Sequence, residues 1–115
     1  MVKQFKNDFL WGASSSAFQI EGAWNEDGKG LTVADYNSFK KSAVQADTKV
    51  ASDFYHHFKE DIALMKELGL KTYRFSLSWA RIIPTGDGEI NQAGIDFYNA
   101  VIDTLLENDI LPFVT

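Results

Sequence analysis

The chain of 115 residues contains no cysteine, which excludes both a disulfide framework and a zinc site built on thiolates. It also has no apolar run that approaches the roughly 18 residues needed to cross a bilayer as a helix. The N-terminal stretch, Met1-Val-Lys-Gln-Phe-Lys-Asn-Asp, lacks the apolar segment that a secretory signal peptide carries. Together these absences predict a cytoplasmic protein with no membrane partner.

Long runs of like charge are missing as well. The 16 acidic residues and 11 lysines and arginines give a net charge of −5 and are interleaved along the chain. This pattern argues against a nucleic-acid partner or an anionic membrane surface. With 45% hydrophobic and 23% charged residues, the composition is typical of a globular protein, and the length predicts a single domain.

Residue periodicity predicts helices that alternate with strands. Two stretches have apolar residues at helical spacing, one ended by Gly69 and one preceded by Asn91 as N-cap. The expected helices span 54–68 and 92–106, and the expected strands span 9–12, 72–79 and 111–115. The last strand is short and apolar, as a strand buried on both faces should be. This order predicts βαβ units with a parallel sheet, and therefore the α/β class.

Residues 24–50 show no clear periodicity and are expected to form a long insertion between the first strand and its helix. In α/β barrels, such insertions lie on the face where active sites are built. Gly28 and Gly30 predict a turn there, but no helix follows directly, so the Gly-x-Gly is no evidence of phosphate binding.

The strand expected at 72–79 alternates between two kinds of side chain. One parity is aromatic or apolar, and the other holds Thr72, Arg74, Ser76 and Ser78. In a parallel strand flanked by helices both faces are buried, so an inward Arg74 needs an anionic partner. A barrel interior with carboxylates at its mouth would supply that partner.

The opening segment, Phe9-Leu-Trp-Gly-Ala-Ser-Ser-Ser-Ala-Phe-Gln-Ile-Glu-Gly-Ala23, combines small residues with an amide and an acid. At the end of a strand, small side chains would let the backbone approach a ligand and aim Gln19 and Glu21 into the open space. An amide both donates and accepts hydrogen bonds, which suits the hydroxyls of a sugar.

This segment resembles the N-terminal signature of glycoside hydrolase family 1. The runs Asp53-Phe-Tyr-His-His-Phe-Lys-Glu-Asp, Tyr73-Arg-Phe-Ser-Leu-Ser-Trp-Ala-Arg81 and Gly88-Glu-Ile-Asn also resemble that family, so the resemblance covers nearly the whole chain. It implies a (β/α)8 barrel of retaining β-glycosidases, with a small-molecule β-glucoside or 6-phospho-β-glucoside as substrate and no cofactor or metal. By the same resemblance, Gln19 would bind the sugar hydroxyls, and Arg74 would orient the nucleophilic glutamate.

The family's acid/base glutamate lies in an Asn-Glu-Pro-like motif and its nucleophile in a Glu-Asn-Gly-like motif, and neither occurs in this sequence. Because a whole barrel takes about 250 residues, residues 1–115 are expected to be the N-terminal fragment of a single (β/α)8 glycosidase domain. This fragment would hold about two and a half βα units and neither catalytic glutamate. The alternative is a non-catalytic fragment or a sugar-binding relic of the barrel, and the oligomeric state stays open.

Other polar and aromatic residues have competing interpretations. Glu21 is expected to be a structural acid that binds nearby backbone N–H groups. His56 and His57 are adjacent on a helix and point about 100° apart, so they cannot share one metal ion. Trp24 and Trp79 could line a sugar subsite or pack in the core.

Overall fold

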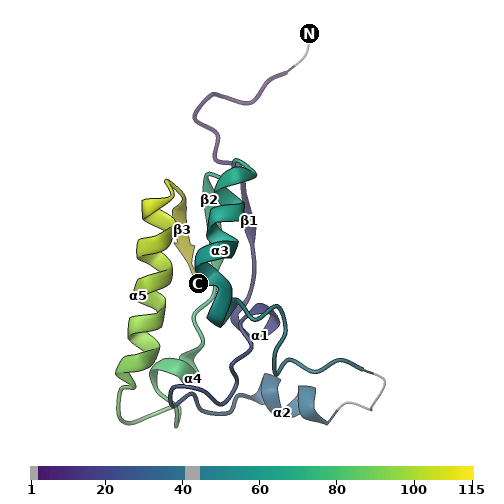
Figure 1. Cartoon of the computed structure of the whole chain (residues 1–115), viewed down its shortest axis with the longest axis vertical. Coiled ribbons are helices and arrows are strands. Elements are labelled where there is room, and N and C mark those ends of the chain that lie inside the picture. Colours follow the sequence, from purple (N-terminus) through teal and green to yellow (C-terminus); the bar gives the residue numbers. More distant parts are fainter. Residues whose placement is uncertain (1–2, 41–44) are drawn as a thin grey trace.

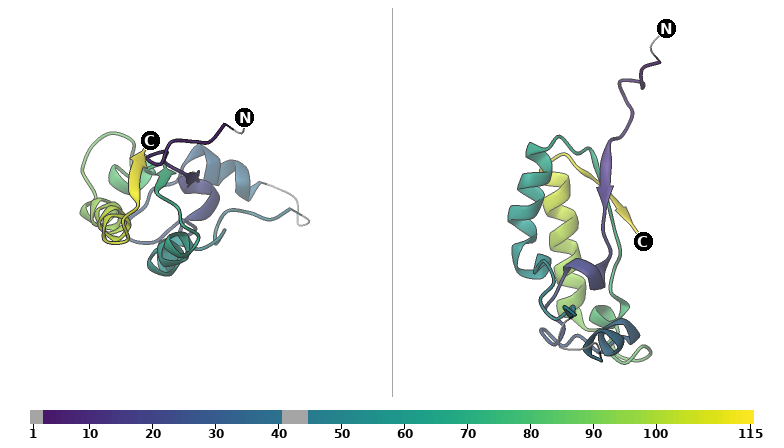
Figure 2. Two further views of the ribbon diagram at one scale, coloured as in Figure 1. Left: turned by 90° about the horizontal axis from the view of Figure 1, so that it is seen from above. Right: turned by 90° about the vertical axis from the view of Figure 1, so that its right-hand side faces the viewer.

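The computed structural model describes residues 3–40 and 45–115, and it has three parallel strands in the order β1-β2-β3. The long helices α3 and α5 lie side by side on one face of this sheet (Figures 1 and 2). Three short helices gather at the other end of the molecule, toward the carboxyl ends of the strands (Figure 1). The elements are β1 (Gly12–Ser14), α1 (Ala17–Ile20), α2 (Val33–Phe39), α3 (Phe54–Glu67), β2 (Thr72–Phe75), α4 (Trp79–Ile82), α5 (Gln92–Glu107) and β3 (Leu111–Val114). The predicted α/β class with a parallel sheet is confirmed.

The core lies between the sheet and the two long helices. Tyr73 and Phe75 alternate toward it from β2, and each is only 3% exposed. They pack with the apolar stripes of the helices, and the cluster consists of Phe54, Ile62, Tyr73, Phe75, Phe97, Tyr98, Val101, Leu105 and Ile110. Burying a side chain of this size stabilises the fold by about 1.5–3 kcal/mol. Both long helices therefore face the core as predicted, but Leu68 and Leu106, at the C-terminal ends of the predicted stripes, are 78% and 51% exposed.

Both long helices have the predicted boundaries to within two residues. Gly69 ends α3 with a positive φ of 80°, and the amides of Gly69 and Leu70 return to carbonyls of the last turn, as in a Schellman motif. Asn91 is the N-cap residue of α5, but its side chain makes no capping bond. Its Nδ2 instead donates to the carbonyls of Asp27 at 2.7 Å and Arg81 at 2.9 Å, which ties three segments together.

The strand predictions need two corrections. The first strand was expected at 9–12 but occupies Gly12–Ser14, and the second ends at Phe75, so that Trp79 begins α4. A Cβ atom at Gly12 would lie 2.4 Å from the carbonyl oxygen of Thr72. The close approach of β2 thus requires a residue without a side chain at Gly12.

The third strand agrees with its expected range, but the expectation that both its faces are buried is wrong. Leu111 and Phe113 are 50% and 62% exposed. The helices cover one face of the sheet, and no element in the described part of the chain covers the other (Figure 2).

The stretch 24–50 contains a helix that periodicity missed. Helix α2 begins with a capping box, in which Thr32 Oγ1 accepts from the Asp35 amide at 3.0 Å and Asp35 Oδ2 accepts from the Thr32 amide at 2.9 Å. The helix has only seven residues, too few to show an amphipathic period. Part of the predicted insertion, 41–44, lies outside the described residues.

Candidate functional site

Gln19 lies in α1, the single helical turn after β1, and not at a strand end as expected. Its side chain is exposed, and Ser16 Oγ donates a hydrogen bond to its Oε1 at 2.6 Å. This bond orients the amide so that its NH2 group points away from Ser16. A helix of one turn is not stable by itself, so the position of Gln19 depends on the contacts that hold α1.

The start of this turn is fixed to β2. The Ser15 amide donates to the carbonyl of Arg74 at 2.9 Å, and the Ala17 amide donates to Ser76 Oγ at 2.8 Å. These two bonds place the segment that carries Gln19 beside the carboxyl end of the strand that carries Arg74. In α/β barrels the carboxyl ends of the strands carry the active site.

Arg74 lies on the sheet face opposite the helices, as its predicted parity requires. In the parallel register it is paired with Ser14 on one side and Phe113 on the other. Its side chain is exposed and forms no ion pair or hydrogen bond with any residue that the structure describes. Ser76 and Ser78, expected on the same strand face, lie beyond the end of β2.

A buried cluster of three polar side chains stands behind Gln19. Arg81 is 1% exposed and Glu21 is 4% exposed, and Arg81 Nε donates to Glu21 Oε2 at 2.7 Å. The other guanidinium nitrogens donate to the carbonyls of Gly22 at 2.9 Å and Ala23 at 3.4 Å. The hydroxyl of Tyr98 donates to Glu21 Oε1 at 2.8 Å. Glu21 is thus a structural acid, but its side chain binds a guanidinium and a phenol instead of the backbone N–H groups that we expected.

Tyr98 serves this cluster as donor and acceptor. Its hydroxyl accepts from the Ser78 amide at 2.6 Å while it donates to Glu21. Burial, followed by the nearby charge of Glu21, raises the pKa of Tyr98 far above its ordinary value, so the phenol keeps its proton. Arg81 also lies over the ring of Tyr55, 4.3 Å from its centroid, in a cation–π contact.

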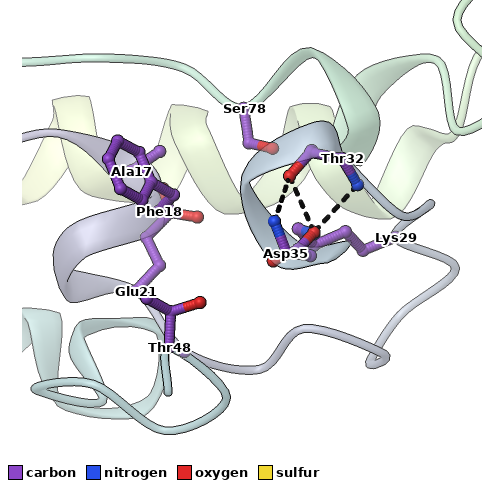
Figure 3. A pocket seen from close by; sticks show the side chains of 9 residues that line it. Ala17, Phe18, Glu21, Lys29, Thr32, Asp35, Thr48 and Ser78 are labelled. Carbon is purple, nitrogen blue, oxygen red and sulfur yellow. Dashed lines mark hydrogen bonds and ion pairs between the residues drawn. The ribbon is translucent and has the colours of Figure 1, made fainter. Parts of the chain in front are cut away.

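A second ion pair closes the loop around α2. Lys29 Nζ lies 2.6 Å from Asp35 Oδ2, with side chains 7% and 5% exposed (Figure 3). Burial opposes ionisation, but hydrogen bonds from Lys29 and Thr32 outweigh it and hold the pKa of Asp35 below its usual value. The adjacent cavity has a volume of about 20 Å³ and is lined in part by Thr48, whose buried hydroxyl has no partner among the described residues. A space of this size holds one water molecule and is far too small for a substrate.

Trp79 lines two larger hollows. One of about 220 Å³ is lined by Phe18, Ser76 and Ser78 among others, and one of about 290 Å³ by Leu31 and neighbours. Trp79 is 59% exposed, whereas Trp24 packs edge-on against Phe39 with ring centroids 4.9 Å apart. Exposed aromatic faces beside hydroxyl groups suit the mixed polar and apolar surface of a sugar.

The two histidines lie beside carboxylates, and both contact Asp53. His56 Nδ1 lies 2.6 Å from Asp53 Oδ1 and its Nε2 lies 2.7 Å from Glu26 Oε2. Hydrogen bonds to these two carboxylates raise the pKa of His56 above its ordinary value. Within residues 3–40 and 45–115 the structure brings no three potential ligands together to hold a metal ion. In the same ranges no helix is sufficiently long and apolar to cross a membrane.

The sequence reasoning missed the roles of Arg81 and Tyr98. A signal was present, because Arg81 stands alone among apolar residues in Trp79-Ala-Arg-Ile-Ile. A charge in such a run is seldom buried without a partner, and Glu21 was the unmatched acid of the opening segment. Tyr98 lies on the core stripe of α5 and gave no separate signal.

Comparison with known proteins identifies the family of this chain. The model of glycosyl hydrolase family 1 matches residues 1–115. A chloroplastic β-D-glucosidase of wheat, which acts on 4-hydroxy-7-methoxy-3-oxo-3,4-dihydro-2H-1,4-benzoxazin-2-yl glucoside, is 54% identical over 96% of this chain and 20% of its own length. The aryl-phospho-β-D-glucosidase BglC of Bacillus subtilis is 53% identical over 98% of this chain and 24% of its own length.

The solved structures agree with the sequence relatives. A family 1 β-glucosidase from Thermotoga maritima superposes with a TM-score of 0.92 at 48% identity, covering 98% of this chain and 26% of that enzyme. The chain therefore spans about a fifth to a quarter of the proteins that it matches, and its fold is a piece of their (β/α)8 barrel. The chain belongs to glycosyl hydrolase family 1.

Proposed function

We propose that the protein containing this chain is a retaining β-glycosidase that hydrolyses β-glucosides, with Gln19 as a sugar contact. One observation carries this proposal: the turn that bears Gln19 is hydrogen-bonded to the carboxyl end of the strand that bears Arg74. The segments that carry an amide able to bind hydroxyls and a guanidinium able to bind a carboxylate therefore meet at the carboxyl end of a parallel strand. The wheat relative is named a β-D-glucosidase and BglC an aryl-phospho-β-D-glucosidase, and both names support the same reaction.

The reaction requires two carboxylates about 5 Å apart, one as nucleophile and the other as acid and then base. In this proposal both glutamates come from outside the 115 residues. Arg74 reaches from the open face of the sheet toward the nucleophile, where its positive charge favours the ionised carboxylate. Gln19 donates to and accepts from hydroxyls of the sugar, and these bonds strengthen as the ring distorts toward the transition state.

A 6-phospho-β-glucosidase is the second candidate, since BglC is an aryl-phospho-β-D-glucosidase. Its identity of 53% is nearly that of the wheat β-glucosidase at 54%, so similarity over this segment favours neither substrate. Neither Gln19 nor Arg74 distinguishes a phosphorylated from an unphosphorylated sugar by its chemistry alone.

The test uses the full-length protein with 4-nitrophenyl β-glucoside and its 6-phosphate. We expect hydrolysis of one of them, with proton NMR showing that the first sugar product is the β-anomer. Gln19→Ala should lower kcat/KM by roughly 5- to 150-fold, which corresponds to about 1–3 kcal/mol for a lost hydrogen bond. An α-anomeric product, or kinetics of Gln19→Ala within about twofold of the parent protein, would contradict the proposal. The cytoplasmic location stays a prediction, which fractionation of cells that express the protein would check.

A further inference from the structure

The position of Gln19 depends on a residue far away in the sequence. Helix α1 is one turn long, and its start is held by two bonds, from the Ser15 amide to the carbonyl of Arg74 in β2 and from the Ala17 amide to Ser76 Oγ just beyond β2. The turn ends at its C-cap residue, Glu21, whose amide closes it by donating to the carbonyl of Ala17 at 3.0 Å. Whatever fixes Glu21 therefore fixes the end of the turn that presents Gln19.

Two side chains fix Glu21. Arg81 donates hydrogen bonds to Oε2 of Glu21 and to the carbonyls of Gly22 and Ala23, so it holds the backbone directly. Tyr98, on α5, takes Oε1. The same hydroxyl accepts from the Ser78 amide, in the loop that follows β2. One phenol thus joins the Gln19 turn to the loop that follows the strand of Arg74.

We propose that Tyr98 is a positioning residue for Gln19, acting through Glu21. This inference rests on the proposed function of Gln19 and deepens it. Removing the hydroxyl leaves a buried carboxylate oxygen and the Ser78 amide without their partner, and the side chain of Glu21 then reorients toward other donors. Arg81 and the Tyr55 amide, which donates to the carbonyl of Glu21 at 3.1 Å, still hold the backbone at that end, so Gln19 is displaced relative to the sugar without being released.

A displacement of this kind affects catalysis more than folding. A shift of about 1 Å in a group that positions a substrate can reduce the rate by as much as 100-fold. Tyr98→Phe keeps the ring in the core between the sheet and the helices and leaves the bond between Arg81 and Glu21 in place. The variant is therefore expected to fold, with a defect in the sugar contact.

The experiment is a double-mutant cycle in the full-length protein, with Tyr98→Phe, Gln19→Ala and the double variant. kcat/KM is measured on 4-nitrophenyl β-glucoside, or on its 6-phosphate if that is the substrate. Titration of each variant with a slowly turned-over 2-fluoro-glucoside of the same kind counts the folded sites, so that partial unfolding does not enter the rate. Tyr36→Phe, at an exposed tyrosine of α2, is the matched control.

We expect Tyr98→Phe to lower kcat/KM about tenfold per folded site, because the contact is weakened and not deleted. In the Gln19→Ala background the same substitution should change kcat/KM less than twofold, and Tyr36→Phe should have no effect in either. A tenfold loss that persists in the Gln19→Ala background would overturn the positioning role, as would unchanged kinetics of Tyr98→Phe alone. If Gln19→Ala by itself leaves kcat/KM unchanged, the proposed sugar contact of Gln19 is wrong. This result differs from the two results that would contradict the positioning role of Tyr98.

Discussion

Arg81 and Arg74 are near neighbours in the sequence but lie in opposite surroundings. Arg81 is 1% exposed and donates to one carboxylate and two carbonyls on the side of the molecule closed by α4 and α5. Arg74 is exposed on the open face of the sheet and has no partner in the described part of the chain. On the closed side the charge of Arg81 is paired with that of Glu21. On the open side the charge of Arg74 is unpaired among the residues that the structure describes. This difference separates an arginine with a structural role from one suited to bind an anionic group.

The apolar residues show the same contrast between the two faces of the sheet. On the helix side, Tyr73 and Phe75 are each 3% exposed, while Phe113, paired with Arg74 on the open face, is 62% exposed. In a (β/α)8 barrel the helices surround the sheet and the other face is the barrel interior. The open face is thus the surface that the rest of a family barrel would enclose, and its exposed side chains follow from that.

The largest effect is expected on the closed side. Arg81→Met should lower the free energy of unfolding by about 3–5 kcal/mol, because it leaves the buried Glu21 carboxylate without its counter-ion. Chemical denaturation measures the loss. The double variant Glu21→Gln/Arg81→Met should regain at least half of it, since no unpaired charge remains buried. A cost below about 1 kcal/mol for Arg81→Met would show that the cluster is not the anchor that its geometry indicates.

The matching change on the open side should reverse the pattern. In the full-length protein, Arg74→Lys should lower the unfolding free energy far less than Arg81→Met does, because it keeps a positive charge beside the proposed nucleophile. It should lower kcat about 100-fold, because an ammonium cannot reproduce the planar fork that orients a carboxylate. The acidic limb of the pH–rate profile should move to higher pH, as the nucleophile becomes easier to protonate.

Arg81→Lys is the control for this prediction, with reduced stability and a smaller change in kcat per folded site. If Arg74 only packs against its neighbours, Arg74→Lys should lower the melting temperature and leave kcat nearly unchanged. Unaltered kcat together with an unaltered acidic limb would end the catalytic interpretation of Arg74.

Much of this contrast could be predicted from the sequence. Alternation along 72–75 placed Arg74 opposite Tyr73 and Phe75, and helical periodicity located α3 and α5, because both patterns are set by backbone geometry alone. The pairing of Glu21 with Arg81 could not be obtained in this way. It joins the C-cap residue of α1 to α4, two positions 60 residues apart that no local periodicity relates.

The candidate site was predicted less completely. Gln19 was identified by its residue type and its neighbours, yet its placement on a helical turn was missed because four residues carry no period. Helix α2 was missed for the same reason, although Thr32 followed by Asp35 is a capping-box spacing that the sequence displays. The strand ends were misplaced because Ser76 to Ser78 continue the alternation after the ladder has stopped.

A smaller effect is expected on the open face of the isolated 115-residue chain. Exposed apolar side chains beside unpaired strand edges favour self-association. Phe113→Ser should raise the dissociation constant of that association at least about tenfold, because burying a phenylalanine side chain contributes about 1.5–3 kcal/mol. Sedimentation velocity over a concentration series measures it. Leu64→Ser, which removes a 55% exposed side chain on α3, should change it much less. Equal effects of the two substitutions would mean that association does not use the sheet.

The same isolated chain should not hydrolyse aryl β-glucosides, since the catalytic glutamates are expected outside it. Turnover by the chain, purified from a host that lacks β-glucosidases, would place the catalytic pair within these residues. That outcome would contradict the view that the open face of the sheet becomes an active site only when the rest of the barrel covers it.

The smallest effect belongs to the rim of the closed side, where His56 bridges Asp53 and Glu26. Hydrogen bonds to these carboxylates raise the pKa of His56, so the folded state binds the proton more tightly than the unfolded state. The stabilisation is complete below the unfolded pKa of about 6.5 and is lost as the pH rises through the folded pKa. His56 is 44% exposed at its side chain, so screening by solvent limits the gain to less than about 1 kcal/mol.

His56→Gln should therefore lower the free energy of unfolding at pH 5.5 and change it little at pH 9, and 0.5 M salt should reduce the difference. His57→Gln is the matched control, because the nitrogens of His57 lie 3.4 Å from Asp53 and 3.5 Å from Glu60, both longer than the His56 contacts. Urea denaturation of both variants and the parent chain at the two pH values gives the comparison. A His56 variant that loses the same stability at pH 9 as at pH 5.5 would show that the side chain acts by packing and not through its charge.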